Sequence, residues 1–260
     1  MVTEVFELEE NLKNQLILLK KEFGLCAIKA EFEAEGSSFR DIIKLRRITL
    51  AHGVPLYLKI GGAEAIRDIK DALELGVDGL VAPMIESSFG LVKFLNACRL
   101  IYGNQKIFKS INIETCQAAE GIDDILKVAS SHIDNITIGR TDLSRSYFDE
   151  QVQPDSKFIQ DLIKSLVKKV SAAELTLTVG GSLSRDSIEC FRDGSKDWSR
   201  QITNLETRKV ILPTNIMLGK EGALKEAIKF EELYLRFKFG IEELMIRSDR
   251  ERFAKLKDRL

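Results

Sequence analysis

The sequence predicts a modified (β/α)8 barrel of the TIM type, and three observations lead to that prediction. Short apolar, β-branched runs alternate with longer segments of helical periodicity. Successive runs begin 23 to 40 residues apart, which is about the length of one strand-plus-helix unit. The chain has 260 residues, close to the roughly 250 that a single barrel of this kind uses.

The apolar runs define seven candidate strands. They begin near Ala27, Leu56, Gly79, Lys109, Asn135, Leu175 and Gln201. Helices between them imply a parallel sheet, and the nearly continuous hydrophobic runs indicate that both faces are covered. No G-x-G-x-x-G fingerprint follows any strand, which favours a closed barrel over an open doubly wound sheet. The eighth strand is either hidden in the run 201–212 or missing.

Three of the intervening helices have recognisable ends. Ser37 or Ser38 can cap a helix that Gly53 ends. A second helix stops at Gly76, and residues 158–170 carry the clearest apolar stripe in the chain. We expect residues 1–220 to form the barrel. Residues 221–260 should form a C-terminal helical extension that packs on the barrel or on a neighbouring subunit.

Composition and charge exclude several classes of protein. The chain has 39 basic and 40 acidic residues, so bulk charge does not favour nucleic acid or a membrane surface. No run of 18 apolar residues predicts a membrane span, and the acidic start lacks the pattern of a secretory signal. We therefore expect a cytoplasmic protein with a small-molecule substrate.

In a parallel barrel the chemistry lies at the carboxyl ends of the strands. These ends carry carboxylates, glycines and a few cations: Glu31, Glu33, Glu35, Lys59, Gly61, Asn112, Glu114, Thr115, Gly139, Arg140, Asp142 and Glu206. The only two histidines, His52 and His132, precede strands, so we expect both at the opposite face. A nucleophile activated by histidine is therefore not expected.

Glu114 and Asp142 form the strongest candidate pair. They follow consecutive strands, which lie about 5 Å apart in a sheet. Two carboxylates at that separation repel unless a positive charge lies between them. Oxygen ligands without nearby thiols or imidazoles favour Mg²⁺ or Mn²⁺. The alternative is a salt bridge with Lys59 or Arg140.

Three short motifs in this region resemble the HpcH/HpaI aldolase and citrate lyase family. They are LVAPMIES, INIET and IGRTDLS, and the match runs in order from about Ala27 to Ser144. The resemblance implies an oligomeric barrel whose C-terminal helices often swap between subunits. It also implies that Glu114 and Asp142 bind a divalent metal, with Asn112 and Thr115 as neighbours at the substrate.

The resemblance further implies that the Gly139 backbone binds the carboxylate of a pyruvate-like ketoacid. This chain departs from the family pattern at three positions. Lys59 stands where the aldolases have an arginine, Arg140 replaces a proline, and the segment 31–35 lacks their histidine base. Glu33, or else Glu35, is therefore the expected base.

Lys59 and Arg140 would balance the anionic groups of the substrate, and Gly61 would offer its N–H group to an anion. Together these residues predict a metal-dependent carbon–carbon lyase, an aldolase of the pyruvate type. It would cleave or form a hydroxy-ketoacid through a metal-stabilised enolate. Three alternatives stay open: a CoA-ester lyase of the citrate lyase kind, a Schiff-base aldolase using Lys59, and a ketoacid-binding barrel without turnover.

Overall fold

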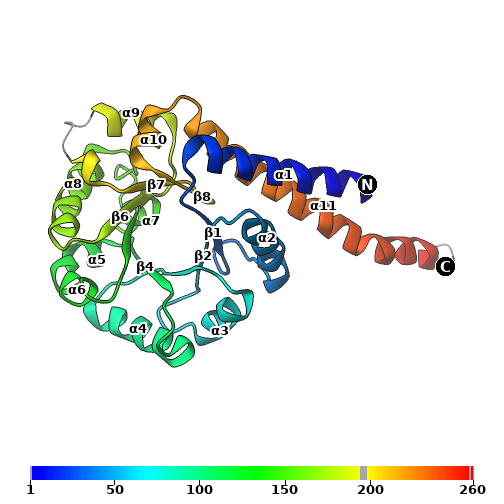
Figure 1. Cartoon of the computed structure of the whole chain (residues 1–260), viewed down its shortest axis with the longest axis horizontal. Coiled ribbons are helices and arrows are strands. Elements are labelled where there is room, and N and C mark those ends of the chain that lie inside the picture. The colour runs from blue at the N-terminus through cyan, green and yellow to red at the C-terminus, as the bar shows by residue number, and fades with distance from the viewer. Residues whose placement is uncertain (1, 194–197, 258, 260) are drawn as a thin grey trace.

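The chain folds into one closed eight-stranded barrel, from which a pair of helices projects (Figure 1). The computed structural model describes residues 2–193, 198–257 and 259. Of the expected 1–220 barrel, residues 1 and 194–197 lie outside the described residues, as do residues 258 and 260 of the expected 221–260 extension. The predicted barrel fold is confirmed.

All seven candidate strands are present, and each pairs with the next in order around the barrel. The strands are β1 Ala27–Glu31, β2 Leu56–Lys59, β3 Gly79–Ala82, β4 Phe108–Ile113, β5 Asn135–Gly139, β6 Thr176–Gly180, β7 Asn204–Glu206 and β8 Val210–Pro213. Strands β1 to β7 run parallel to one another. Their carboxyl ends therefore share one rim, which we call the mouth of the barrel.

The eighth strand is hidden in the predicted run and extends one residue beyond it. Only Thr207, Arg208 and Lys209 separate β7 from β8, so the two strands form a hairpin and β8 runs antiparallel to both β7 and β1. The Thr207 N–H donates to Val210 O at 2.9 Å across the turn. Because β8 pairs with both neighbours, the barrel has no open sheet edge.

Helices cover the outside of the barrel. They are α2 Phe39–Ala51, α3 Ile66–Leu75, α4 Ser88–Tyr102, α5 Cys116–Glu120, α6 Ile122–Ala129, α7 Arg140–Arg145, α8 Lys157–Ala172, α9 Arg185–Asp193 and α10 Thr214–Gly219, with a 3₁₀ turn at Ser199–Gln201. Ser38, one of the two predicted caps, closes a capping box with Asp41 at the start of α2. Among the described residues, no helix is long and apolar enough to cross a membrane.

The strand face toward the helices is apolar, but the barrel interior is mixed, so the expectation of continuous hydrophobic strands is wrong there. Inside, Asn135 Nδ2 donates to Ser110 Oγ at 2.8 Å, and Thr178 Oγ1 donates to Asn135 Oδ1 at 3.1 Å. These side chains line a cavity of about 150 Å³ together with Glu206 and with apolar residues such as Val81. The alternation of side chains along each strand directs these polar residues inward.

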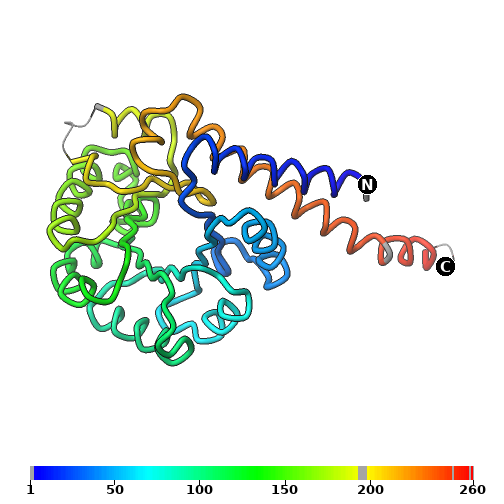
Figure 2. The backbone as a smooth tube through the Cα atoms, in the orientation of Figure 1, coloured from blue at the N-terminus to red at the C-terminus, as the bar shows by residue number. Residues whose placement is uncertain are grey.

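The projecting arm is built from both ends of the chain. Helix α1 Val2–Phe23 lies along helix α11 Ala223–Lys257, and Figure 2 shows the two side by side from the barrel outward, with α11 extending beyond α1. Gln15 Nε2 donates to Glu226 O at 3.0 Å, and Leu12 and Phe230 are buried. The sequence analysis anticipated the C-terminal helix but not its pairing with an N-terminal one.

Candidate active site at the barrel mouth

Glu114 is the central buried carboxylate of the mouth. It follows β4 and is only 2% exposed. Its Oε1 accepts the Met84 N–H at 3.0 Å, and its Oε2 accepts Asn112 Nδ2 at 3.0 Å. Met84 has a φ of 52°, which is uncommon outside glycine. A strained backbone at such a contact is typical of a functional site.

Lys59 and Asp142 are on either side of this carboxylate in strand order. Lys59 ends β2, and its Nζ lies 3.9 Å from Glu114 Oε2. Asp142 is half-buried in the first turn of α7, directly after β5. The alternative for the pair Glu114 and Asp142 was a salt bridge with Lys59 or Arg140. The structure contains the one between Lys59 and Glu114. It is long, so it leaves the carboxylate with further capacity to bind a cation.

Two glycines make room for the carboxylates of the mouth. A Cβ atom on Gly139 would lie 2.8 Å from Glu114 Oε2, and one on Gly180 would lie 2.5 Å from Glu206 Cγ. Real Cβ atoms essentially never make contacts under 3.0 Å. Any larger residue at either position would therefore displace a carboxylate, which explains why β5 and β6 both end in glycine.

A second ionic cluster lies deeper, on β1 and β7. Lys29 Nζ is 2.5 Å from Glu206 Oε1 and 3.6 Å from Glu31 Oε1, and all three residues are buried. Burial by itself would lower the pKa of Lys29, but Glu206, Glu31 and the more distant Glu114 outweigh it and raise that pKa. Lys29 is therefore charged. A mid-strand lysine belongs to no motif and so could not be predicted as a site residue, although its spacing of two from Glu31 indicates the same inward face.

The mouth carries an excess of negative charge. Its buried or half-buried carboxylates are Glu31, Glu114, Asp142 and Glu206, and its ammonium groups are Lys29 and Lys59. Four negative and two positive charges leave two negative charges without a partner among these groups. Buried charge without compensation is costly. A divalent cation would balance the mouth.

The two candidate bases on the loop after β1 have different environments. Glu33 is exposed, and its side chain lies close to Gly61, next to the end of β2. A Cβ atom added to Gly61 would be 3.2 Å from Glu33 Oε1. Glu35 instead forms a buried ion pair with Lys209 from the β7–β8 turn. The Glu35 carboxylate is therefore already engaged and less available to a substrate. The geometry therefore favours Glu33.

Arg140 is occupied by the fold. Its guanidinium donates to the carbonyl oxygens of Gly180 and Gly181 at 3.2 and 2.7 Å, and to Asp155 Oδ1 at 2.5 Å. Only 1% of the residue is exposed. These partners satisfy most of its donors and leave little for a substrate anion, so the structure favours a structural role over the catalytic and substrate-binding role expected for it.

Two further candidates also have local partners. Thr115 is the N-cap of α5, where its hydroxyl accepts the Ala118 N–H at 3.2 Å. The Gly61 N–H, expected to face an anion, donates instead to Asp68 Oδ2 at 2.7 Å. Both residues lie at the mouth as predicted, but their polar groups are used to hold the strand-to-helix turns.

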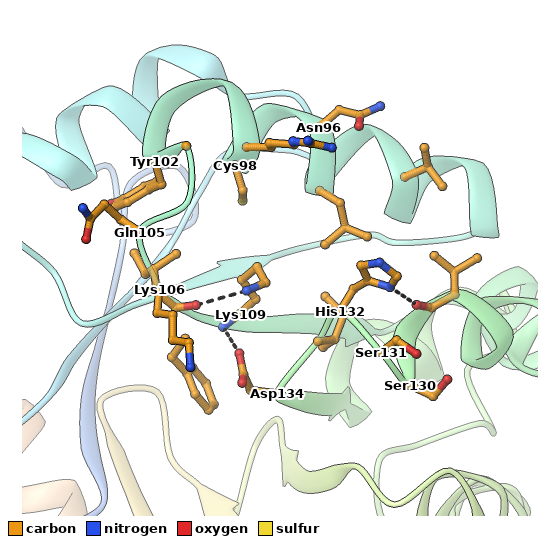
Figure 3. A pocket seen from close by; sticks show the side chains of 18 residues that line it. Asn96, Cys98, Tyr102, Gln105, Lys106, Lys109, Ser130, Ser131, His132 and Asp134 are labelled. Carbon is orange, nitrogen blue, oxygen red and sulfur yellow. Dashed lines mark hydrogen bonds between the residues drawn. The ribbon is translucent and has the colours of Figure 1, made fainter.

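A larger hollow of about 870 Å³ lies away from the mouth, between the ends of α4 and α6 (Figure 3). Its lining includes His132, whose Nδ1 lies 3.0 Å from Val128 O. Both predicted positions for histidine are confirmed, since His132 precedes β5 and His52 ends α2 before β2. Of the cations in its lining, Arg99 lies in the last turn of α4, where positive charge offsets the helix dipole, whereas Lys106 lies in the loop after α4 and Lys109 on β4.

The donor set at the mouth fits a divalent metal. Asn112 Oδ1 is buried and has no hydrogen-bond partner among the described residues, and the amide of the same side chain contacts Glu114. This oxygen, Glu114 and Asp142 are hard ligands of the kind that Mg²⁺ and Mn²⁺ prefer. In the described part of the chain no three His, Cys, Asp or Glu side chains converge on one point. A bound metal would therefore take further ligands from Asn112, water or the substrate.

The fold and the mouth define a barrel enzyme whose polar groups gather at the carboxyl ends of parallel strands. The family model HpcH/HpaI aldolase/citrate lyase matches residues 60–189, which is half of the chain. The protein therefore belongs to the HpcH/HpaI aldolase/citrate lyase family, and so to enzymes of the lyase kind. The matched segment includes Asn112, Glu114 and Asp142. No curated protein matches the sequence closely enough to refine this assignment.

Solved structures share the fold at low sequence identity. An HpcH/HpaI aldolase from Desulfitobacterium hafniense is 16% identical, with a TM-score of 0.59 over 76% of this chain and 81% of its own. A variant of the citrate synthase SbnG is 17% identical, with a TM-score of 0.53 over 74% and 79%. RipC from Yersinia pestis is 16% identical, with a TM-score of 0.52 over 79% and 87%.

The contact between Gly139 and Glu114 leads to the first prediction. Gly139→Ala should lower the free energy of unfolding by about 1–3 kcal/mol, because the added methyl group overlaps the buried carboxylate. Gly62→Ala is the matched control, since no atom lies within 4 Å of its Cβ position. Urea denaturation of both variants measures the difference. Equal stability of the two would contradict the packing described for the mouth.

Proposed function

We propose that this protein is a divalent-metal-dependent carbon–carbon lyase that cleaves or forms a hydroxy-ketoacid of the pyruvate type. The observation that carries the proposal is the buried Glu114 carboxylate beside the unpartnered Asn112 Oδ1. The net negative charge of the mouth supports it. Membership of a family of aldolases and lyases supports the reaction class.

The residues of the mouth have separate roles in this proposal. Glu114 and Asp142 would hold the metal, Mg²⁺ or Mn²⁺, with Asn112 beside them. When bound, a divalent cation stabilises negative charge that develops on the ketoacid oxygen. The Lys59 ammonium binds and orients the substrate carboxylate, and the backbone of Gly139 would bind the same carboxylate. Glu33 accepts the proton from the ketoacid carbon next to the carbonyl, since it is exposed at the rim, whereas Glu35 is engaged by Lys209.

The proposal is tested by deuterium exchange into C3 of pyruvate, which is followed by NMR. Exchange is compared before metal removal, after metal removal, and after Mg²⁺ is added back. Glu114→Gln and Asp142→Asn should each lower the metal-dependent exchange rate by more than about a hundredfold, because each removes a charged ligand. Their unfolding midpoints should stay close to that of the unaltered protein. Glu150→Gln, an exposed carboxylate on the loop after α7, is the control and should exchange normally.

Either of two results would overturn the metal assignment. One is exchange that persists after chelation of all metal. The other is exchange by Glu114→Gln and Asp142→Asn at the rate of Glu150→Gln.

The exposed part of Lys59 supports a second candidate, a Schiff-base aldolase. Its side chain is 15% exposed at the mouth, so a ketone could reach the amine. Its Nζ lies 3.9 Å from Glu114 Oε2, and an amine that is paired with a carboxylate is better suited to ion pairing than to nucleophilic attack. We expect borohydride to trap no pyruvate adduct, whereas Lys59→Ala should weaken pyruvate binding at least tenfold in a calorimetric titration. A trapped adduct that is lost in Lys59→Ala would establish the Schiff-base reaction instead.

We also propose that the protein is a homo-oligomer assembled through the tip of its arm. Beyond residue 241 the exposed apolar side chains include Met245 and Phe253, which are 63% and 60% exposed. A chain ending at Ile241 should have a lower oligomeric mass by light scattering while it keeps its unfolding midpoint. An unchanged mass would show that the arm tip does not hold the assembly.

A further inference from the structure

Lys209 is a buried ammonium group that the proposed chemistry does not use. It lies in the turn between β7 and β8 and is 1% exposed. Its Nζ pairs with Glu35 Oε2, and its carbonyl oxygen accepts the Lys29 N–H at 2.8 Å. The backbone of Lys209 is thus held by β1, and its side chain by the loop that follows β1.

Helix α11 completes the enclosure of this ammonium group. The Tyr234 ring lies 4.5 Å from Lys209 Nζ, an arrangement in which the ring face attracts the cation. Glu231, one turn earlier on α11, is half-buried, and burial raises the pKa of its carboxyl group. Burial also lowers the pKa of Lys209, and the Glu35 carboxylate opposes that shift. Three separate parts of the chain therefore meet at one cation.

The loop held by this pair carries the proposed base. Residues 32–37 form a tight turn in which the Ser37 N–H donates to Phe32 O at 2.9 Å, and Gly36 has a φ of 56°. Glu33 lies inside this turn, two residues before Glu35. The Lys209–Glu35 pair is the salt bridge that ties the turn to the rest of the barrel among the described residues.

Burial of an ion pair is a poor way to gain stability. Replacing such a pair with neutral residues of similar size is often neutral or stabilising, whereas removing one partner is destabilising. The fold therefore does not require a charged pair here. A better reason for the presence of the ion pair is that it fixes a loop in one position. Small displacements of a catalytic group can cost about a hundredfold in rate.

We infer that Lys209 is a positioning residue, which through Glu35 fixes the loop 32–37 so that Glu33 faces the substrate. The role given to Glu33 rests on the proposed function. Lys209 itself is closed off from substrate by its partners. Because it also packs against α11, Lys209 connects the root of the arm with the reacting end of the barrel.

The test uses the full chain and three variants: Lys209→Met, Glu35→Gln, and both together. In all three, the C3 exchange rate should fall about tenfold or more, since the loop is no longer held. Mn²⁺ affinity should stay within about twofold of the unaltered protein, since the metal ligands lie on β4 and α7. Backbone hydrogen–deuterium exchange should speed up in residues 32–37 of each variant.

The double variant separates positioning from stability. Neither member of this pair is left charged without the other, so its unfolding midpoint should recover relative to Lys209→Met. The C3 exchange rate should not recover with it. Recovery of both together would overturn the inference, because the pair would then serve the fold alone. A loop whose backbone exchange is unchanged in all three variants would overturn it as well.

Lys93→Met is the matched control, because it removes another ion pair between rim elements. Lys93 Nζ lies 2.7 Å from Glu64 Oε1 on the loop after β2, and both side chains are partly exposed. This variant should alter neither loop exchange nor turnover. If the unaltered protein shows no metal-dependent C3 exchange, the proposed function fails, and the backbone exchange of residues 32–37 still decides whether Lys209 holds the loop.

Discussion

Compensation of buried charge inside the barrel is the constraint on which the arrangement of the mouth depends. Lys29 is held between Glu206 and Glu31, and Lys59 lies beside Glu114. Each of these groups lost its water on folding, and only an opposite charge or hydrogen bonds can offset that cost. The glycines that end β5 and β6 follow from the same constraint, since only they leave space for carboxylates. The negative charge left over is what makes a divalent cation a suitable ligand.

The antiparallel hairpin of β7 and β8 gives the barrel a second distinctive property. A crossover helix between these strands would place β8 parallel and its preceding loop at the opposite face. The three-residue turn instead brings Lys209 to the mouth, and β8 leads through α10 into α11. The closure of the barrel, the root of the arm and the loop with Glu33 are consequently adjacent.

Family membership and the residues of the mouth bear on function at different levels. The family model and the related structures define the barrel and the lyase class. The chain itself has Lys59 at the end of β2 and no histidine at the mouth. A compact ammonium group pairs with a carboxylate without the fixed two-point geometry of a guanidinium. Substrate orientation here would thus depend on the surrounding carboxylates and on how firmly the rim loops are held.

The sequence by itself determined the barrel, the strand ends and the position of Glu114, because apolar periodicity and turn residues are local signals. It also placed both histidines away from the mouth. Only the tertiary structure decided which polar groups already have ion-pair partners. Arg140 is paired with Asp155, and Glu35 is paired with Lys209. Partners such as these are far apart in sequence, and their pairing depends on barrel register and burial. The polar interior was likewise decided in three dimensions, where alternate residues of neighbouring strands meet.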